Sequence, residues 1–322
     1  MRIDNLAPIV LFVYNRPQHT QNTINALINN KLSQESILYI FADGPKENAA
    51  QDQIKNIEKV RQIINSIRGF KQVVVYEEKI NKGLANSVIE GVSKIIEQHE
   101  KVIVLEDDLV TSPAFLSYMN HALSYYKDYP SVFSISADRP QNIVIPSDYP
   151  FDVFVSLRAF SYGWGTWKEK WNKINWNYNA IPDIFQNSAI KQAFNRGGED
   201  LSRMLQEQQQ GRIDSWAIRF VLSHFIHHSI SIMPCKSYIN NIGHDGSGTH
   251  CQATSALQLP IELNCNSEPL FLPVLYEDAA IINSFYSAYY PKRRPLWKKI
   301  INRLCRLIGK QNVFIIKNQV YH

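Results

Sequence analysis

Three consecutive carboxylates, Glu106, Asp107 and Asp108, are the residues of this chain best suited to chemistry. They directly follow Val102–Leu105, whose β-branched and leucine side chains predict a short, buried strand of a parallel sheet. Adjacent acids repel one another, so stability alone does not explain their place at the end of a core strand. A divalent cation or the donor groups of a ligand would offset that repulsion, and carboxylate oxygens suit Mg²⁺ or Mn²⁺. The alternative is a solvated acidic turn without a function.

Polar residues also follow two earlier predicted strands. Asn15 and Arg16 come after the apolar run 9–14, and Asp43 comes after the run 37–42. The carboxyl ends of parallel strands share one edge of a sheet, and ligands of open α/β sheets bind outside that edge. We therefore expect these side chains and the three acids to face a single crevice.

The elements that must position these residues alternate regularly up to residue 137. Such alternation predicts βαβ units and a mainly parallel, Rossmann-like sheet. No Gly-x-Gly-x-x-Gly turn follows the first strand, which counts against a dinucleotide-binding enzyme. The periodicity predicts strands at 9–14, 37–42, 73–76, 101–105 and 132–136, helices at 18–29, 49–68 and 84–96, and a further helix with Ser112 as its N-cap.

Aromatic residues crowd into a short part of the second half. They either form a platform for sugar rings or pack a core, and the sequence leaves both interpretations open, although two interleaved glycines favour a tight loop that exposes some rings. The residues are Tyr162, Trp164, Trp167, Trp171 and Trp176.

Two later segments also carry residues that could do chemistry. Asp214 opens a predicted helix, where an acid is most often the N-cap. The loop 240–250 combines three glycines with His244 and His250, and such loops often close over active sites.

Composition places the chain among ordinary globular proteins. It has 322 residues, 45% hydrophobic and 20% charged, which predicts one large domain with insertions or two lobes. No signal peptide and no apolar stretch of the ~20 residues that span a bilayer are apparent. The four cysteines are far apart, which predicts neither a zinc site nor a disulfide framework and suits a reducing cytoplasm.

The positive charge belongs to the C-terminal segment. Residues 279–322 contain nine Lys and Arg and no acid, which leaves 25 basic against 29 acidic side chains before them. We therefore expect no nucleic-acid partner for the body of the protein. Residues 295–309 predict a basic amphipathic helix, which favours binding to an anionic membrane surface, at the inner face of the cell membrane. The alternative is that its apolar stripe docks on the rest of the protein.

In the order in which they follow one another along the chain, these motifs resemble those of nucleotide-sugar-dependent glycosyltransferases of the GT-A fold. The first half is similar to family 2, with the turn Asn15-Arg16-Pro17, then Asp43, the helix start 81–86 (Asn-Lys-Gly-Leu-Ala-Asn), and the acids 106–108 where that family keeps its Asp-x-Asp motif. The later motifs are similar to enzymes of the N-acetylglucosaminyltransferase I type, which share a Gly-Trp loop, a Trp-containing helix start and a Gly/His loop. The resemblance covers residues 7–250.

The resemblance implies a fold and a division of the chain. It implies an α/β GT-A domain, with a Rossmann-like, mainly parallel sheet and flanking helices, followed by an amphipathic helical tail. Residues 1–137 would form the nucleotide-sugar-binding half, residues 138–278 the acceptor-binding and catalytic half of the same domain, and residues 279–322 the basic tail.

The resemblance also implies roles for the acids after the fourth strand. Asp108 would bind the metal, Asp107 would face the ribose, and Glu106 would face the donor sugar. Asp43 would hydrogen-bond the base.

Further residues receive roles from the same resemblance. Asn15 and Arg16 would lie at the other side of the base, and Lys82 would contribute to the donor site. Asp214 would be the general base that deprotonates the acceptor. His244 or His250 would complete the metal site or touch the diphosphate.

The implied activity is metal-dependent, inverting transfer of a hexose or N-acetylhexosamine from a UDP-sugar. The cofactor would be Mn²⁺ or Mg²⁺, and the acceptor a glycan or lipid-linked glycan in surface polysaccharide synthesis. One rival is a sugar-phosphate nucleotidylyltransferase, which would carry a Gly-rich, basic loop after the first strand where this chain has Val13–Pro17. The other rival is a non-catalytic carbohydrate-binding protein.

Overall fold

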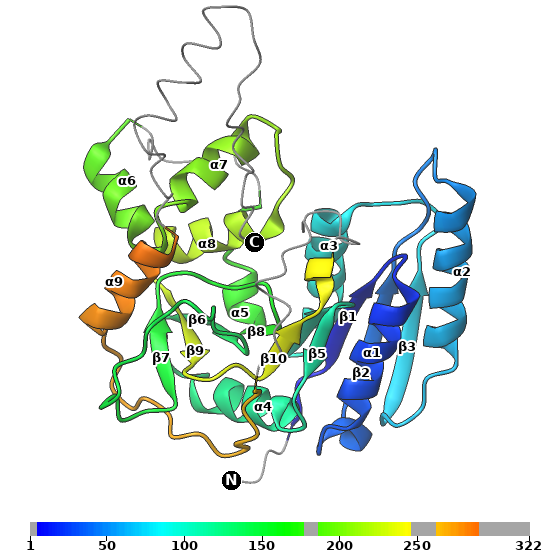
Figure 1. Cartoon of the computed structure of the whole chain (residues 1–322), viewed down its shortest axis with the longest axis horizontal. Coiled ribbons are helices and arrows are strands. Elements are labelled where there is room, and N and C mark those ends of the chain that lie inside the picture. The colour runs from blue at the N-terminus through cyan, green and yellow to red at the C-terminus, as the bar shows by residue number, and fades with distance from the viewer. Residues whose placement is uncertain (1–4, 177–185, 246–261, 290–322) are drawn as a thin grey trace, which may run out of the picture.

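A computed structural model describes residues 5–176, 186–245 and 262–289 of the chain (Figure 1). Its strands are β1 (Ile9–Val13), β2 (Ile37–Ala42), β3 (Gln72–Glu77), β4 (Lys101–Glu106), β5 (Leu109–Thr111), β6 (Val132–Ser136), β7 (Val153–Ser156), β8 (Trp164–Trp167), β9 (Ile230–Pro234) and β10 (Ile239–Asn241). Its helices are α1 (Pro17–Ile28), α2 (Gln51–Asn65), α3 (Leu84–Ile96), α4 (Phe115–Tyr125), α5 (Lys168–Trp171), α6 (Ser188–Phe194), α7 (Leu201–Gln209), α8 (Trp216–Ile226) and α9 (Ala279–Ala288).

One large sheet organises the described residues. Its strand order is β3-β2-β1-β4-β8-β6-β9-β7, and only β8 and β7 run against the other six strands. A second, two-stranded sheet pairs β5 with β10. The predicted α/β fold with a mainly parallel sheet and flanking helices is therefore confirmed.

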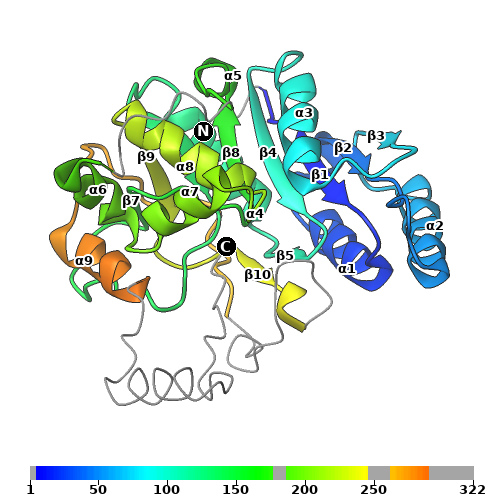
Figure 2. The same ribbon diagram turned by 90° about the horizontal axis from the view of Figure 1, so that it is seen from above.

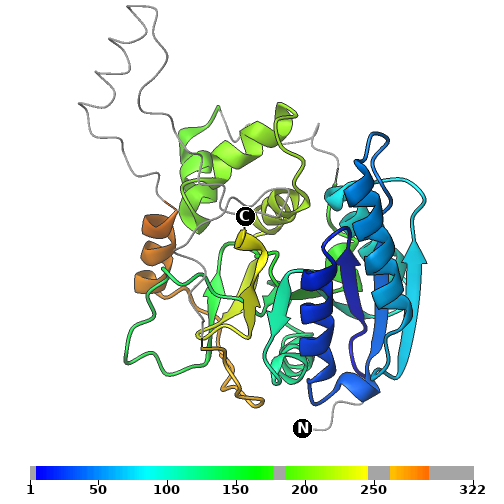
Figure 3. The ribbon, with the colours of Figure 1, turned by 45° about the vertical axis from the view of Figure 1, so that its right-hand side comes forward.

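Each face of the large sheet is covered by helices that bury an apolar core. Helices α1, α2 and α4 pack on one face, around residues such as Leu11, Leu27 and Leu116 (Figure 3). Helices α3, α7 and α8 pack on the other face, around residues such as Val10 and Val92 (Figure 2). Because both faces are buried, β1 reads as a continuous apolar run rather than as an alternating one.

The strands and helices predicted before residue 137 are present, with ends shifted by a few residues. One predicted detail is wrong, because α4 begins at Phe115 with Ala114 as N-cap instead of Ser112. The Ser112 amide donates to the Tyr238 carbonyl and its own carbonyl accepts from the Phe115 amide, so Ser112 belongs to the turn before the helix. The short strand β5 was not predicted.

The aromatic cluster of the second half is mostly core. Trp164, Trp167 and Trp171 are only 1%, 6% and 2% exposed, so the expectation that the glycines would expose such rings is wrong for these three. The reason is that Gly165 lies within β8, a strand between β4 and β6 in the middle of the sheet. A Cβ at this glycine would lie 2.9 Å from the Val102 carbonyl oxygen, so close strand packing explains the glycine.

The segment that follows residue 278 begins with helix α9. Its residues Ile281 and Phe285 pack with Phe154 and Met233 at the β7 end of the sheet. The predicted amphipathic helix at 295–309 lies outside the described residues. Within the described part of the chain, no helix is long and apolar enough to cross a bilayer.

Candidate functional site

The candidate site lies where the strand order reverses. From β1 the chain moves outward through β2 to β3 and then returns to place β4 on the other side of β1. In an open α/β sheet the crevice at such a switch point, outside the carboxyl ends of the strands, is the usual place for a ligand. Arg16 follows β1 and Asp107 follows β4, so these two residues flank that crevice.

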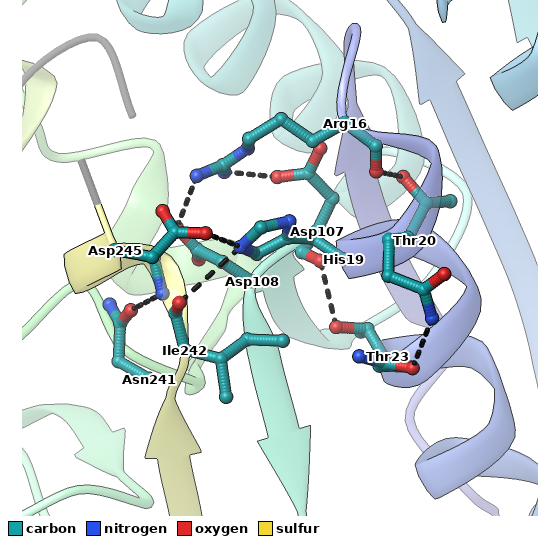
Figure 4. Close-up of polar contacts among 12 residues, drawn as sticks. Arg16, His19, Thr20, Thr23, Asp107, Asp108, Asn241, Ile242 and Asp245 are labelled. Atoms are coloured by element: carbon teal, nitrogen blue, oxygen red, sulfur yellow. Dashed lines mark hydrogen bonds and ion pairs between the residues drawn. The ribbon is translucent and has the colours of Figure 1, made fainter. Parts of the chain in front are cut away.

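Arg16 bridges two of the three acids (Figure 4). Its guanidinium forms an ion pair with Asp107 Oδ1 through Nη2 and with Asp108 Oδ2 through Nη1, the latter at 2.9 Å. The side chains of Asp107 and Asp108 are 5% and 9% exposed. The sequence implied a place for Arg16 beside the base, whereas its described contacts are with the acids.

Burial and mutual repulsion shape the charges of this cluster. Burial raises the pKa of Glu106 to about 8, the charges of Asp108 and Asp107 add to that effect, and Arg16 opposes it. Burial also raises the pKa of Asp107 to about 6 against the opposing charge of Arg16. Burial alone would lower the pKa of Arg16, but the two aspartates outweigh it and raise that pKa above its ordinary value. The cluster therefore carries more negative charge than one guanidinium balances.

The turn after β10 closes over the cluster. The Ile242 amide donates to the Asp108 carbonyl, and His19 in α1 contacts both the Ile242 carbonyl and the Asp245 carboxylate. A Cβ at position 243 would lie 2.2 Å from Asp108 Oδ2, so any larger residue there would displace the Asp108 carboxylate. The turn thus contributes backbone and polar groups to the same site.

Asp43 is bound entirely to the turn that starts α3. Its Oδ1 accepts the amides of Gly44 and Lys82 at 2.8 and 2.9 Å, and its Oδ2 accepts from Asn81 Nδ2 and the Gly83 amide at 2.9 and 3.1 Å. Four donors fill the usual accepting positions of one carboxylate. Asp43 therefore fastens the end of β2 to the start of α3.

A pocket of about 330 Å³ lies beside that turn, between β2, β3 and α3. The rings of Phe41 and Tyr76 stack at 4.8 Å and form part of its wall. Lys82 also lines the pocket and pairs with Glu78 and Glu90 at 2.8 and 2.9 Å. The pocket therefore combines aromatic faces with a charged rim.

The remaining predicted residues have separate settings. Asn15 is half-buried directly after β1. Asp214 pairs with Arg219 and, within the described residues, makes no contact with the acids after β4. The N-cap of α8 is Ser215, so the alternative role of Asp214 as N-cap is wrong. His244 is close enough for the Asp108 charge to oppose the lowering of its pKa by burial. His250 lies outside the described residues.

The residues of the cluster do not fit a divalent metal ion as they are arranged. Arg16 already holds one oxygen of each aspartate. Across the described ranges, no group of three or more His, Cys, Asp or Glu side chains is placed to hold a metal ion. Asp107 Oδ2 is buried and has no hydrogen-bond partner among the described residues. A metal at Asp108 would thus require Arg16 to move.

Several residues of this edge were not predicted. The sequence predicts a loop at Gly243 but no role for this glycine, and no pattern indicates a role for His19, three residues after Arg16 on the first turn of α1. Asp138 follows β6 and accepts a hydrogen bond from Ser237 Oγ at 2.7 Å, and burial raises its pKa to about 6. Asp138 follows β6 at the same end of the sheet as the acids that follow β4, because β6 and β4 both run antiparallel to β8.

Comparisons with known proteins give weak likenesses. No family model and no curated protein matches the sequence. The chain is similar to residues 1–349 of S. aureus TarS (TM-score 0.38, 12% identity, 72% of this chain and 59% of that one). It is also similar to mouse xyloside xylosyltransferase 1 (TM-score 0.36, 9% identity, 70% and 84%) and to the galactosyltransferase LgtC (TM-score 0.34, 9% identity, 67% and 69%). The match thus spans less than two thirds of the TarS chain, and likenesses of this size carry no argument about family or activity.

Proposed function

We propose that the protein is a glycosyltransferase that uses a nucleotide-sugar donor. The observation that carries this proposal is the position of the Arg16–Asp107–Asp108 cluster at the switch point of a mainly parallel sheet. The buried polar atoms without a hydrogen-bond partner within the described residues include Asp107 Oδ2 in the cluster and Ser87 Oγ at the neighbouring pocket. Buried polar atoms are normally satisfied, so such orphans point to a ligand.

The neighbouring pocket suits the base of the donor. Its stacked rings offer an apolar wall, and its volume of about 330 Å³ is of the size expected for a small-molecule site. The Asp43 carboxylate holds the Asn81–Gly83 turn at the mouth of this pocket. The donor phosphates would then extend along the sheet edge toward Arg16, whose positive charge would attract them.

The transfer would be a single displacement with inversion at the anomeric carbon. An acid on the acceptor side would remove the acceptor proton while the nucleoside diphosphate leaves. Asp214 is the base that the sequence implied, at the start of a helix that leads directly into β9. Asp138 is a second candidate, because it lies at the same sheet edge and burial raises its pKa toward the range of a general base.

Finer features remain proposals that rest on the sequence. They are a UDP-linked hexose or N-acetylhexosamine as donor, as in enzymes of the N-acetylglucosaminyltransferase I type, and a glycan or lipid-linked acceptor in surface polysaccharide synthesis. A cytoplasmic location at the inner face of the membrane belongs with them. Mn²⁺ or Mg²⁺ at Asp108, with His250 as a further ligand, also stays a proposal.

The proposal is tested by the release of nucleoside diphosphate from UDP-glucose, UDP-N-acetylglucosamine and GDP-mannose, with and without Mn²⁺. We expect wild-type protein to hydrolyse at least one of them and Asp108→Asn to lose about 10²-fold in rate, because Arg16, which would attract the donor phosphates, loses one of the two carboxylates that position it. Asp214→Asn and Asp138→Asn should separate the two candidate bases, since the true base is expected to cost about 10²-fold or more.

The control variant is Asp52→Asn, an exposed acid of α2 that should leave the rate unchanged. Thermal stabilisation by sugars without turnover would instead favour a carbohydrate-binding protein. Release of pyrophosphate from a nucleoside triphosphate and a sugar phosphate would favour a nucleotidylyltransferase.

A further inference from the structure

We propose that Arg16 is an internal counter-ion that competes with divalent cations for Asp107 and Asp108. The inference concerns the site of the proposed function but does not require sugar transfer. Arg16 would then determine how tightly the site binds a metal ion. The family resemblance had implied a different place for it, beside the nucleotide base.

Hydrogen bonds fix the backbone on both sides of the ion pair between Arg16 and Asp107. Arg16 is the residue before α1, and its carbonyl accepts the Thr20 amide and the Thr20 hydroxyl at 3.0 and 2.9 Å. Thr23 of the same helix donates to the Asp107 carbonyl at 2.8 Å. The start of α1 and the end of β4 are therefore fastened together, which fixes the distance that the Arg16 side chain spans (Figure 4).

The guanidinium and a metal ion would bind the same carboxylate oxygens of Asp107 and Asp108. Arg16 Nη1 lies 2.9 Å from Asp108 Oδ2, and Nη2 contacts Asp107 Oδ1. A bound Mg²⁺ or Mn²⁺ would sit at about 2.0–2.2 Å from such oxygens, inside the volume that the guanidinium fills. Arginine stays protonated in proteins, so it cannot give way by losing its charge and must move instead.

The turn at residues 243–245 bounds the other side of the site formed by Arg16 and the two aspartates. A Cβ at Gly243 would lie 2.2 Å from Asp108 Oδ2 and 3.1 Å from Arg16 Nη1, so the backbone of the 243–245 turn packs against both groups. The guanidinium and this turn therefore both occupy the space around Asp108 Oδ2. The orphaned Asp107 Oδ2 is an oxygen that a cation could add once Arg16 has withdrawn.

The test is a Mn²⁺ titration of the full chain, with free Mn²⁺ measured by electron paramagnetic resonance. We expect Arg16→Gln to bind Mn²⁺ at least about ten-fold more tightly than wild type, because the competing charge is gone. Arg16→Lys keeps the charge and should stay close to wild type. Arg68→Gln removes an exposed arginine elsewhere and should change nothing.

A double variant places the gained affinity at this site. Arg16→Gln combined with Asp108→Asn should lose the tighter Mn²⁺ binding. Equal or weaker Mn²⁺ binding by Arg16→Gln would overturn the inference, as would a gain that persists in the double variant or appears equally in Arg16→Lys.

Loss of Arg16 could also unfold the protein, because two buried carboxylates would lose their partner. In that case the inference expects millimolar Mn²⁺, but not the same ionic strength of K⁺, to restore the far-ultraviolet circular dichroism of Arg16→Gln. Failure of Mn²⁺ to restore it would overturn the inference. Tighter Mn²⁺ binding in a protein that hydrolyses no nucleotide sugar would reject the proposed function and leave the counter-ion role standing.

Discussion

His224 lies in the core between α8 and the sheet, where its ring meets two polar partners. Its Nδ1 donates to the Phe220 carbonyl at 2.8 Å, so in the neutral ring Nε2 accepts from the Ser134 hydroxyl at 2.9 Å. Burial lowers the pKa of His224 to about 4, the nearby His227 adds to that effect, and the Phe220 carbonyl opposes it. The folded protein therefore keeps this histidine neutral under conditions in which an unfolded chain protonates it.

This residue predicts a pH dependence of stability. Its unfolded pKa of about 6.5 exceeds the folded value, so the unfolded state binds more protons and stability falls as pH drops from about 6.5 to about 4. Between pH 7.5 and 5 wild type should lose about 2 kcal/mol of unfolding free energy through this group. Urea unfolding of wild type and His224→Gln at both pH values measures it.

The comparison with the variant is needed because other groups act in the opposite direction. The raised pKa values of Glu106 (about 8) and of Asp107 and Asp138 (both about 6) make folding more favourable as pH falls from each of these values toward about 4. Those contributions are common to both proteins and cancel in the difference. The assignment to His224 fails if both proteins lose the same amount between the two pH values.

At the scale of elements, the junction between β2 and α3 depends on a single carboxylate. The turn at residues 81–83 leaves backbone amides that no helix carbonyl accepts, as at any helix start. Asp43 accepts two of those amides and the Asn81 side chain, while its own amide donates to the Val13 carbonyl of β1. One residue thereby connects two strands with the start of a helix.

We expect Asp43→Ala to destabilise the protein by about 2–3 kcal/mol, because one buried and three partly buried donors lose their acceptor. Urea unfolding measures the change, and Asp52→Ala, an exposed acid in the first turn of α2, should stay within about 0.5 kcal/mol of wild type. If Asp43→Ala instead keeps its stability and loses only nucleotide binding, the turn-fastening role is wrong and the sequence-implied contact with the base is favoured.

At the scale of the whole molecule, the two halves of the chain share one sheet, because β8 from the second half lies between β4 and β6 from the first. The basic segment continues from α9, which packs on the β7 end of that sheet through Phe285. The segment from residue 279 onward contains nine Lys and Arg residues and no acid, and all nine lie outside the described part of the chain. The proposal that this basic segment binds a membrane can be tested directly with lipid vesicles.

We expect the full chain to sediment with vesicles that contain anionic lipid and not with neutral ones. Changing Lys298, Lys299, Arg303 and Arg306 together to Gln should abolish most of this binding, since each charge near such a surface contributes about 1 kcal/mol at low salt. Lys55→Gln with Lys59→Gln on α2 serves as the control. Equal sedimentation of the charge-reduced and wild-type chains would reject the tail as the anchor.

The sequence by itself determined the strand and helix alternation of the first half and the place of its polar residues at strand ends. Both follow from local rules, because a buried strand next to a helix is set by short-range periodicity and by the residues that end each element. The convergence of Arg16 with the acids after β4 could be expected at the level of the sheet edge, since parallel strands end on one side.

The contacts among these polar side chains depend on the tertiary structure. Arg16 and Asp107 are 91 positions apart, and their ion pair depends on β1 and β4 being neighbours, which no local pattern specifies. The insertion of β8 between β4 and β6 likewise buries Trp164 and Trp167, and Trp171 of α5 is buried against Trp164. Strand order depends on long-range pairing, whose free energy comes from contacts across the whole sheet. The ion pairs of Arg16 with Asp107 and Asp108 could therefore be identified only in the folded chain.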